Sequence, residues 1–131
     1  MLAAALPAAT QIAPLDFETG KLLSLAPGQW TYSPMATGSA ALYGSLLALR
    51  CDRSSRTVTI ERVGAAPAAI VIATSSAVRA LPAGGRLAAT DPFLDAIAFS
   101  RGRFLVGGGA GPVLAVPSWP EAARSIEDCR N

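Results

Sequence analysis

Two aspartates four positions apart, Asp91 and Asp95, come closest in this sequence to a pair that could do acid–base or metal chemistry. On a helix they share one face, where paired carboxylates can exchange protons or ligate Ca²⁺. Their segment begins Thr-Asp-Pro, which is typical of a helix start, so Asp91 also has an explanation as a cap. No second ligand cluster and no EF-hand loop accompanies them. We therefore predict no catalytic residue, no metal and no cofactor.

The absence of histidine from the 131 residues removes several reaction classes. Ser-His and Cys-His catalysis and imidazole-ligated zinc all require this residue. The sole lysine, Lys21, lies in a segment with little predicted structure, which argues against a Ser-Lys catalytic pair. A formal net charge of +2 is too small to indicate nucleic-acid binding. We expect a protein that is not an enzyme and does not bind nucleic acid.

Arg101 and Arg103 are the first candidates for binding. In an extended chain, residues two apart point to the same side, and two guanidinium groups can hold a carboxylate or a phosphate. The alternative is that they form internal ion pairs with Asp91, Asp95 or Glu127. The sequence does not decide between these alternatives.

The run from Gly107 to Gly111 raises the question of a phosphate-binding loop. It lacks the Lys-Ser/Thr ending of a P-loop and the spacing of a dinucleotide-binding motif. It also leads into a predicted strand, so no helix N-terminus would face a phosphate. We predict a hairpin loop here.

Hydrophobic patterning predicts a strand-rich chain. The clearest strand is 56–62, where polar and apolar residues alternate and place Val58 and Ile60 on one side. It should form a hairpin with 46–51, whereas 34–39 and 82–86 should be loops. Residues 75–81 fit either a helical turn or an edge strand. The remaining strands are expected at 29–33, 68–74, 103–106 and 113–116, and helices at 91–99 and 119–129.

The last predicted helix begins with Ser118-Trp119-Pro120-Glu121, which fits a capping box. Its periodicity places Trp119 and Cys129 on the buried face. Cys51 comes at the end of a predicted buried strand. The two cysteines, 78 positions apart, are either buried free thiols or one long-range disulfide. An exported context favours the disulfide, which would attach the helix to the sheet.

Residues 1–27 are predicted to be a weakly structured lead-in, followed by one domain at 28–131. Residues 2–9 have the apolar and small residues that end a signal peptide, but no basic residue precedes them. We interpret them as the remainder of a truncated signal peptide, the alternative being an Ala/Pro-rich leader of a cytosolic protein. The longest uncharged run, 22–49, is broken by prolines and glycines, so no membrane span is expected.

Several segments resemble small exported proteins of Gram-negative bacteria that have no assigned function. The likeness covers about 90 residues and rests on 91–104, 116–121 and 126–130 together with Leu49-Arg50-Cys51-Asp52. It implies an envelope, periplasmic location and supports the Cys51–Cys129 disulfide. It implies no activity and supplies no catalytic residue.

A looser resemblance is to the periplasmic lysozyme inhibitors. Those small β-barrels carry one disulfide and use a serine-rich loop and a basic loop against the acidic cleft of the enzyme. Ser75 and Ser76 would correspond to the first loop, and Ser100 to Arg103 to the second. The predicted helices and the wide spacing of the two loops depart from that family's pattern.

These observations predict an α+β fold, a curled antiparallel sheet of about five to seven strands, sandwich- or barrel-like, with a short helix and a C-terminal helix packed on it. The predicted function is that of a non-enzymatic periplasmic accessory or binding domain. Its partner would be an envelope protein or an anionic ligand. The alternative is an inhibitor of a cell-wall lytic enzyme. Ligand and oligomeric state do not follow from the sequence.

Overall fold

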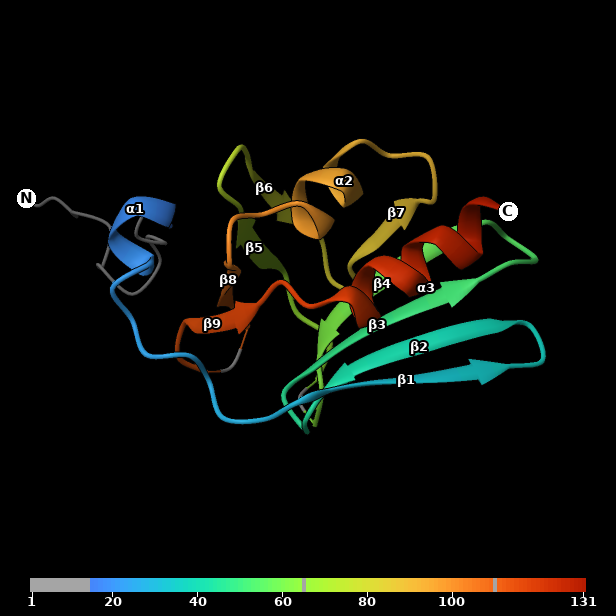
Figure 1. Cartoon of the computed structure of the whole chain (residues 1–131), viewed down its shortest axis with the longest axis horizontal. Coiled ribbons are helices and arrows are strands. Elements are labelled where there is room, and N and C mark those ends of the chain that lie inside the picture. Colours follow the sequence, from blue (N-terminus) through green and yellow to red (C-terminus); the bar gives the residue numbers. More distant parts are fainter. Residues whose placement is uncertain (1–14, 65, 110) are drawn as a thin grey trace, which may run out of the picture.

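The computed structural model describes residues 15–64, 66–109 and 111–131, which form two antiparallel sheets and three helices (Figure 1). The first sheet has the strand order β1-β2-β3-β4-β7, and the second has the order β6-β5-β8-β9. The elements are α1 (Phe17–Gly20), β1 (Trp30–Met35), β2 (Gly38–Tyr43), β3 (Leu47–Asp52), β4 (Thr57–Arg62), β5 (Ile70–Ala73), β6 (Val78–Leu81), β7 (Arg86–Ala88), α2 (Phe93–Ala98), β8 (Arg103–Gly108), β9 (Leu114–Pro117) and α3 (Pro120–Arg130).

The predicted hairpin at the centre of the first sheet is confirmed. β3 and β4 pair antiparallel, with Cys51 opposite Val58 and Leu49 opposite Ile60. Val58 and Ile60 are buried and alternate with half-buried Thr57 and Thr59, as the sequence pattern requires of a strand with one core face.

The first sheet contains a further strand, β2, that the sequence analysis did not predict. β1 continues to Met35 and β2 begins at Gly38, so the predicted loop at 34–39 is wrong except for two turn residues. β2 then ends at a turn whose Gly44 has φ of +54°, a conformation that favours glycine. The sequence of β2 is rich in alanine and lacks the alternation of large apolar and polar residues seen in β4. Small side chains fill the space between β2 and α3, which packs on it.

The second sheet confirms β5 as a central strand, paired with β6 on one side and β8 on the other. Residues 78–81 form an edge strand, which decides the alternative left open by the sequence. β8 and β9 form the predicted hairpin, but Gly107 and Gly108 belong to β8 and not to its loop, because they pair with Val71 and Ile70 of β5.

The predicted strand number is wrong, because the described chain contains nine strands in two sheets. β7 falls partly in the predicted 82–86 loop and has only three residues, too few to show alternation. The two sheets share one core, to which β4, β5 and β8 contribute Ile60, Ile72 and Phe104. They do not close into a barrel or form one curled sheet.

The C-terminal helix α3 covers the core face of β1, β2 and β3 (Figure 1). Ile126 and Cys129 on its inner face are almost fully buried. Cys129 forms a disulfide with Cys51 of β3, and their Cα atoms lie 5.6 Å apart. The predicted disulfide and its role in attaching the last helix to the sheet are therefore confirmed.

The start of α3 differs from the prediction in two ways. Trp119 is not a core residue, since 46% of it is exposed. The capping box does not form either, and the Ser118 hydroxyl and one Glu121 oxygen are buried without hydrogen-bond partners. The reason is that Trp119, not Ser118, occupies the N-cap, so serine and glutamate are one position out of register with the motif. The Ser118 N–H instead donates to Gly102 O at 3.1 Å.

The described part of the lead-in contacts the second sheet. Helix α1 packs on β8, and Leu15 lies against Leu105 and Ala115. Ala26 N donates to Ala115 O at 2.8 Å. The predicted signal-peptide remainder lies outside the described residues. Among the helices described, none is long and apolar enough to cross a membrane.

Candidate functional site

Two loops predicted to bind come together in space although they are 25 residues apart in the sequence. One is the β5–β6 turn, 74–77, and the other is the α2–β8 connection, 99–103. Ser75 N donates to Ser100 Oγ at 2.9 Å, and Arg101 N donates to Ser75 Oγ at 3.0 Å. We call these two segments the serine–arginine loop pair. The structure therefore brings together Ser75, Ser76, Arg101 and Arg103, the four candidate binding residues.

Each loop is also held by its own hydrogen bonds. Thr74 Oγ1 accepts from the backbone N–H groups of Ser76 and Ala77, at 3.2 and 3.0 Å. In the other loop, Ser100 is buried and its hydroxyl donates to Arg103 O at 2.6 Å. Because both backbones are fixed before any partner arrives, binding there would cost little ordering entropy.

The two arginines do not form the internal ion pairs that the sequence offered as an alternative. Asp91 pairs with Arg79 at 2.8 Å and Asp95 with Arg130 at 2.7 Å. Glu127 has only a longer contact to Arg130, 3.8 Å. Within the described ranges, no carboxylate lies within ion-pairing distance of Arg101 or Arg103.

The two arginines also do not share one extended strand, so the expected same-side arrangement is wrong. Gly102 has φ of +76° and turns the chain between them, and β8 begins only at Arg103. Arg103 is half-buried and its Nη1 donates to Leu23 O at 2.5 Å. Arg101 is exposed. Arg101 is thus the member of the pair whose charge is available to a partner.

Two exposed aromatic residues accompany the loop pair, Phe99 within it and Trp119 beside Ser118; the sequence analysis did not single out Phe99 and predicted Trp119 to be buried. Phe99 ends α2 and is 78% exposed. Trp119 follows Ser118, whose N–H is bonded to Gly102 O. Aromatic and arginine side chains contribute most of the binding energy in many protein interfaces. Helical periodicity could have indicated Phe99, since it falls on the opposite side of the helix from the apolar face of Phe93 and Ile97.

Asp91 and Asp95 serve the structure rather than forming a carboxylate pair. Asp91 Oδ1 accepts from Phe93 N at 2.9 Å, which confirms its role at the helix start. Burial alone would raise the pKa of Asp91, but the Phe93 N–H and the Arg79 guanidinium hold it below its usual value. Asp95 is bound to Arg130 on α3. Each carboxylate is bound by a different arginine, and both bonds hold parts of the fold together.

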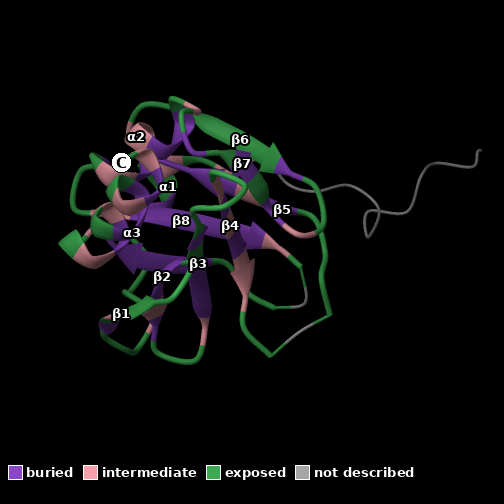
Figure 2. Ribbon diagram, turned by 90° about the vertical axis from the view of Figure 1, so that its right-hand side faces the viewer, coloured by how far each residue is buried: buried purple, intermediate pink, exposed green. Residues whose placement is uncertain are grey.

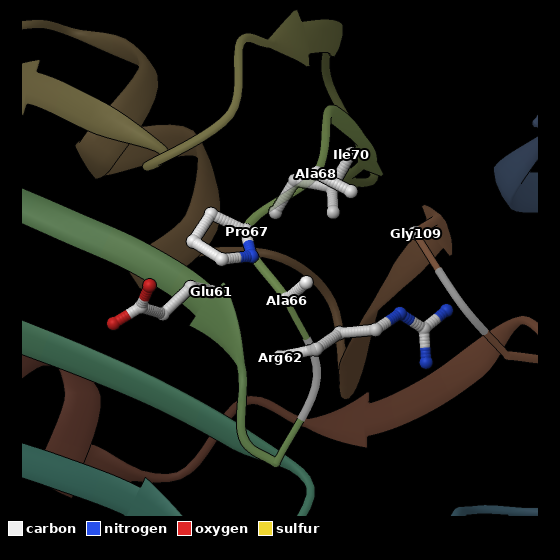
Figure 3. Close-up of a pocket in the computed structure, with 7 residues that line it drawn as sticks. All are labelled: Glu61, Arg62, Ala66, Pro67, Ala68, Ile70 and Gly109. Atoms are coloured by element: carbon white, nitrogen blue, oxygen red, sulfur yellow. The ribbon is translucent and has the colours of Figure 1, made fainter.

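The pocket drawn in Figure 3 has room for about one water molecule. Its two charged residues diverge: Glu61 turns away and pairs with Arg50, while Arg62 extends toward Gly109. Arg62 Nε donates to Gly108 O at 3.0 Å and Nη2 to Pro112 O at 2.6 Å. Burial lowers the pKa of this guanidinium. Arg62 therefore fixes the glycine-rich hairpin loop, and phosphate is not needed to explain it.

A polar cluster beside the disulfide was not apparent from the sequence. Tyr32 OH donates to Asp128 Oδ2, and the Arg124 guanidinium lies 4.0 Å from the centre of the Tyr32 ring. Burial opposes ionisation of Asp128, but the Tyr32 hydroxyl and nearby Arg53 and Arg124 lower its pKa overall. Tyr32 and Asp128 are 96 residues apart, and no local pattern predicts their contact. The cluster ties α3 to β1.

The described residues contain no group of three or more His, Cys, Asp or Glu side chains that could hold a metal ion. Comparisons of the chain with protein-family models, curated proteins and solved structures found no match.

Proposed function

We propose that this chain is a non-enzymatic accessory or binding domain of the periplasm, and that it recognises an acidic protein partner through the serine–arginine loop pair. The observation that carries the proposal is the position of Arg101. It is exposed, held on a backbone fixed by Ser75, and without a carboxylate partner in the described chain. An arginine fork in this setting is suited to a carboxylate on another molecule.

The surroundings of Arg101 favour a protein over a free anion. A free anion would be held by several converging donors, whereas the backbone N–H groups of Ser75, Ser76 and Arg101 are already used within the loops. Phe99 and Trp119 add exposed apolar area beside the charge. An apolar anchor next to an arginine is the composition of a protein interface hot spot.

The proposed location rests on the buried disulfide and on the resemblance to exported proteins of Gram-negative bacteria. Structural disulfides form and persist in oxidising compartments, of which the bacterial periplasm is one. Fractionation of cells, with free thiols trapped at lysis, should recover the chain in the periplasmic fraction with Cys51 and Cys129 oxidised. Recovery in the cytoplasmic fraction with free thiols would contradict this location.

The test of the proposal is a comparison of two charge reversals, Arg101→Glu and Arg86→Glu. Both arginines are exposed, and the described chain gives neither side chain a hydrogen bond or ion pair. Immobilised wild type and Arg86→Glu should retain the same acidic protein from an envelope extract, and Arg101→Glu should lose it. Retention by all three proteins would contradict the proposal.

One specific observation favours the second candidate, an inhibitor of a cell-wall lytic enzyme. The structure joins the serine loop and the basic loop, whose separation in the sequence had counted against that function. Wild type in molar excess should then slow lysozyme-catalysed clearing of cell walls, and Arg101→Glu should not. Unchanged clearing by wild type would reject the inhibitor and leave the broader binding proposal standing.

A further inference from the structure

Four strands lie at sheet edges, and three of them are protected. An exposed edge invites pairing with another chain, so proteins usually block it. On β1, Pro34 lacks an N–H group. On β9, Ala115 O accepts from Ala26 N and Pro117 O accepts from Trp30 Nε1. β7 has only three residues, and Ala88 O accepts from Asp91 N.

The fourth edge, β6, is open. Thr74 N donates to Ala77 O, so Thr74 and Ala77 are a hydrogen-bonded pair at the turn between β5 and β6. In an antiparallel pair of strands, hydrogen-bonded pairs recur at every second residue. The register Ile72↔Arg79 and Val71↔Ala80 therefore turns the N–H and C=O groups of Arg79 toward β5. Those of Val78 and Ala80 point outward, and no described backbone group pairs with them there.

The exposure of β6 agrees with this geometry. Val78 is 56% exposed, and Arg79 and Ala80 are exposed as well. Figure 2 shows β6 as an exposed arrow on the outside of the molecule, beside the buried strands of the core. The four outward groups match the spacing of an added strand.

We propose that the binding site of the proposed function continues along β6, where the partner adds an extended acidic segment as a further strand. This inference rests on the proposed function. Ser75 and Ser76 form the turn that leads directly into Val78, so a strand paired with β6 passes the loop pair at its end. A carboxylate at that end reaches Arg101. Backbone pairing supplies affinity, and Arg101 selects for acidic side chains.

A second copy of this chain is a poorer occupant of the same edge. Antiparallel self-pairing through Val78 and Ala80 places Arg79 directly opposite Arg79 of the other copy. Like charges at directly opposed positions destabilise a strand pair. In each copy, the Asp91 carboxylate is already bound to Arg79 of the same chain. Asp91 is therefore not free to neutralise Arg79 of the other copy.

Ala80→Pro tests the edge without breaking the β5–β6 ladder. Proline removes the outward N–H of residue 80, whereas the bonds to β5 come from its neighbours. The matched control, Ala80→Val, keeps that N–H and has a higher strand propensity. Both variants should retain the thermal unfolding midpoint of wild type to within a few degrees, which establishes that they fold.

The probe is a library of random twelve-residue peptides selected on immobilised wild type. Enriched peptides should carry Asp or Glu and bind Ala80→Val like wild type. Ala80→Pro should bind them about tenfold more weakly, the loss expected for one interfacial hydrogen bond. Methylating alternate backbone nitrogens of the peptide should also abolish binding. Equal affinity of Ala80→Pro, enrichment of non-acidic peptides, or no enrichment would each overturn the inference.

The two proposals fail in distinguishable ways. If Arg101→Glu loses the envelope partner while Ala80→Pro retains it, the loop pair binds and the β6 edge does not. If neither variant loses it, the proposed function itself is wrong. A wild-type dimer in sedimentation that Ala80→Pro converts to monomer would overturn the acidic segment in favour of a second copy.

Discussion

Asp128 is a charged residue that joins α3 to β1. It accepts from Tyr32 OH and lies near Arg53 and Arg124. Its pKa is lowered in the folded protein relative to the unfolded chain. The stabilisation is therefore complete above the unfolded pKa, about 3.9, and is lost as the pH falls through the lower folded pKa.

Asp128→Asn should destabilise the protein by about 1 to 2 kcal/mol at neutral pH, because the charged acceptor is lost while Tyr32 stays half-buried. Urea denaturation of both proteins between neutral pH and pH 2 would measure this. The difference between them should shrink below about pH 4. A constant difference across that range would show that the carboxylate charge contributes nothing.

Ile126→Ala and Trp119→Ala compare a buried residue of α3 with the exposed residue at its N-cap. Ile126 is 1% exposed, so its truncation should cost about 2 to 5 kcal/mol. Trp119 is 46% exposed and should cost less than about 1 kcal/mol. Chemical denaturation measures both values. A Trp119→Ala variant as unstable as Ile126→Ala would place Trp119 in the core, as its helical position first indicated.

At the scale of elements, β2 and β3 approach closely at Gly38. A Cβ atom on this residue would lie 1.9 Å from Cys51 O, and a backbone carbonyl cannot rotate away as a side chain can. Gly64, in the loop after β4, has open space around it and φ of +81°. The two glycines are needed for different reasons, the first for space and the second for conformation.

Gly38→Ala should therefore destabilise the protein by about 2 to 3 kcal/mol, and Gly64→Ala by about 1 kcal/mol. Thermal unfolding under identical conditions ranks the two variants. The reverse order would mean that the β2–β3 pair relaxes readily at its end.

Strands and helices were predictable where the local sequence carries a clear signal, such as an alternation of polar and apolar residues or a helix-start motif. The alternation around Val58 and the helix start at Asp91 identified β4 and α2 correctly. β2 and β7 were missed because small residues and a length of three leave no period to detect. The capping box at Ser118 failed because the N-cap is Trp119, while a distant carbonyl, Gly102 O, accepts from the Ser118 N–H.

The candidate site was predictable by residue but not by arrangement. The spacing of the arginines indicated Arg101 and Arg103, and the resemblance to lysozyme inhibitors indicated Ser75 and Ser76. The structure places the two loops that carry them together. The sequence did not show which arginine is available to a partner. Gly102 turns the chain between the two arginines, and Leu23 O binds the Arg103 side chain, and no sequence motif indicates either feature. The register of the β5–β6 pair decides which backbone groups of β6 point outward. The short apolar runs of these two strands do not determine that register from the sequence alone.

At the scale of the whole molecule, one covalent bond joins the first sheet to the last helix. Removing it with Cys51→Ala and Cys129→Ala together should lower the free energy of unfolding by about 4 to 5 kcal/mol, since the closed loop spans 78 residues. Denaturation of the double variant, beside wild type with and without reductant, measures the loss. A variant as stable as the oxidised protein would show that packing of Ile126 and its neighbours is sufficient.

The most direct test of the loop pair as a binding surface is photo-crosslinking in the intact envelope. Phe99 is replaced by p-benzoylphenylalanine, which keeps an aromatic ring at an exposed site, and Arg86 carries the same group in the control. The position at 99 should yield one discrete adduct with an acidic protein, and Arg101→Glu in the same chain should abolish it. Absence of an adduct at 99, or the same adduct from 86, would contradict the account.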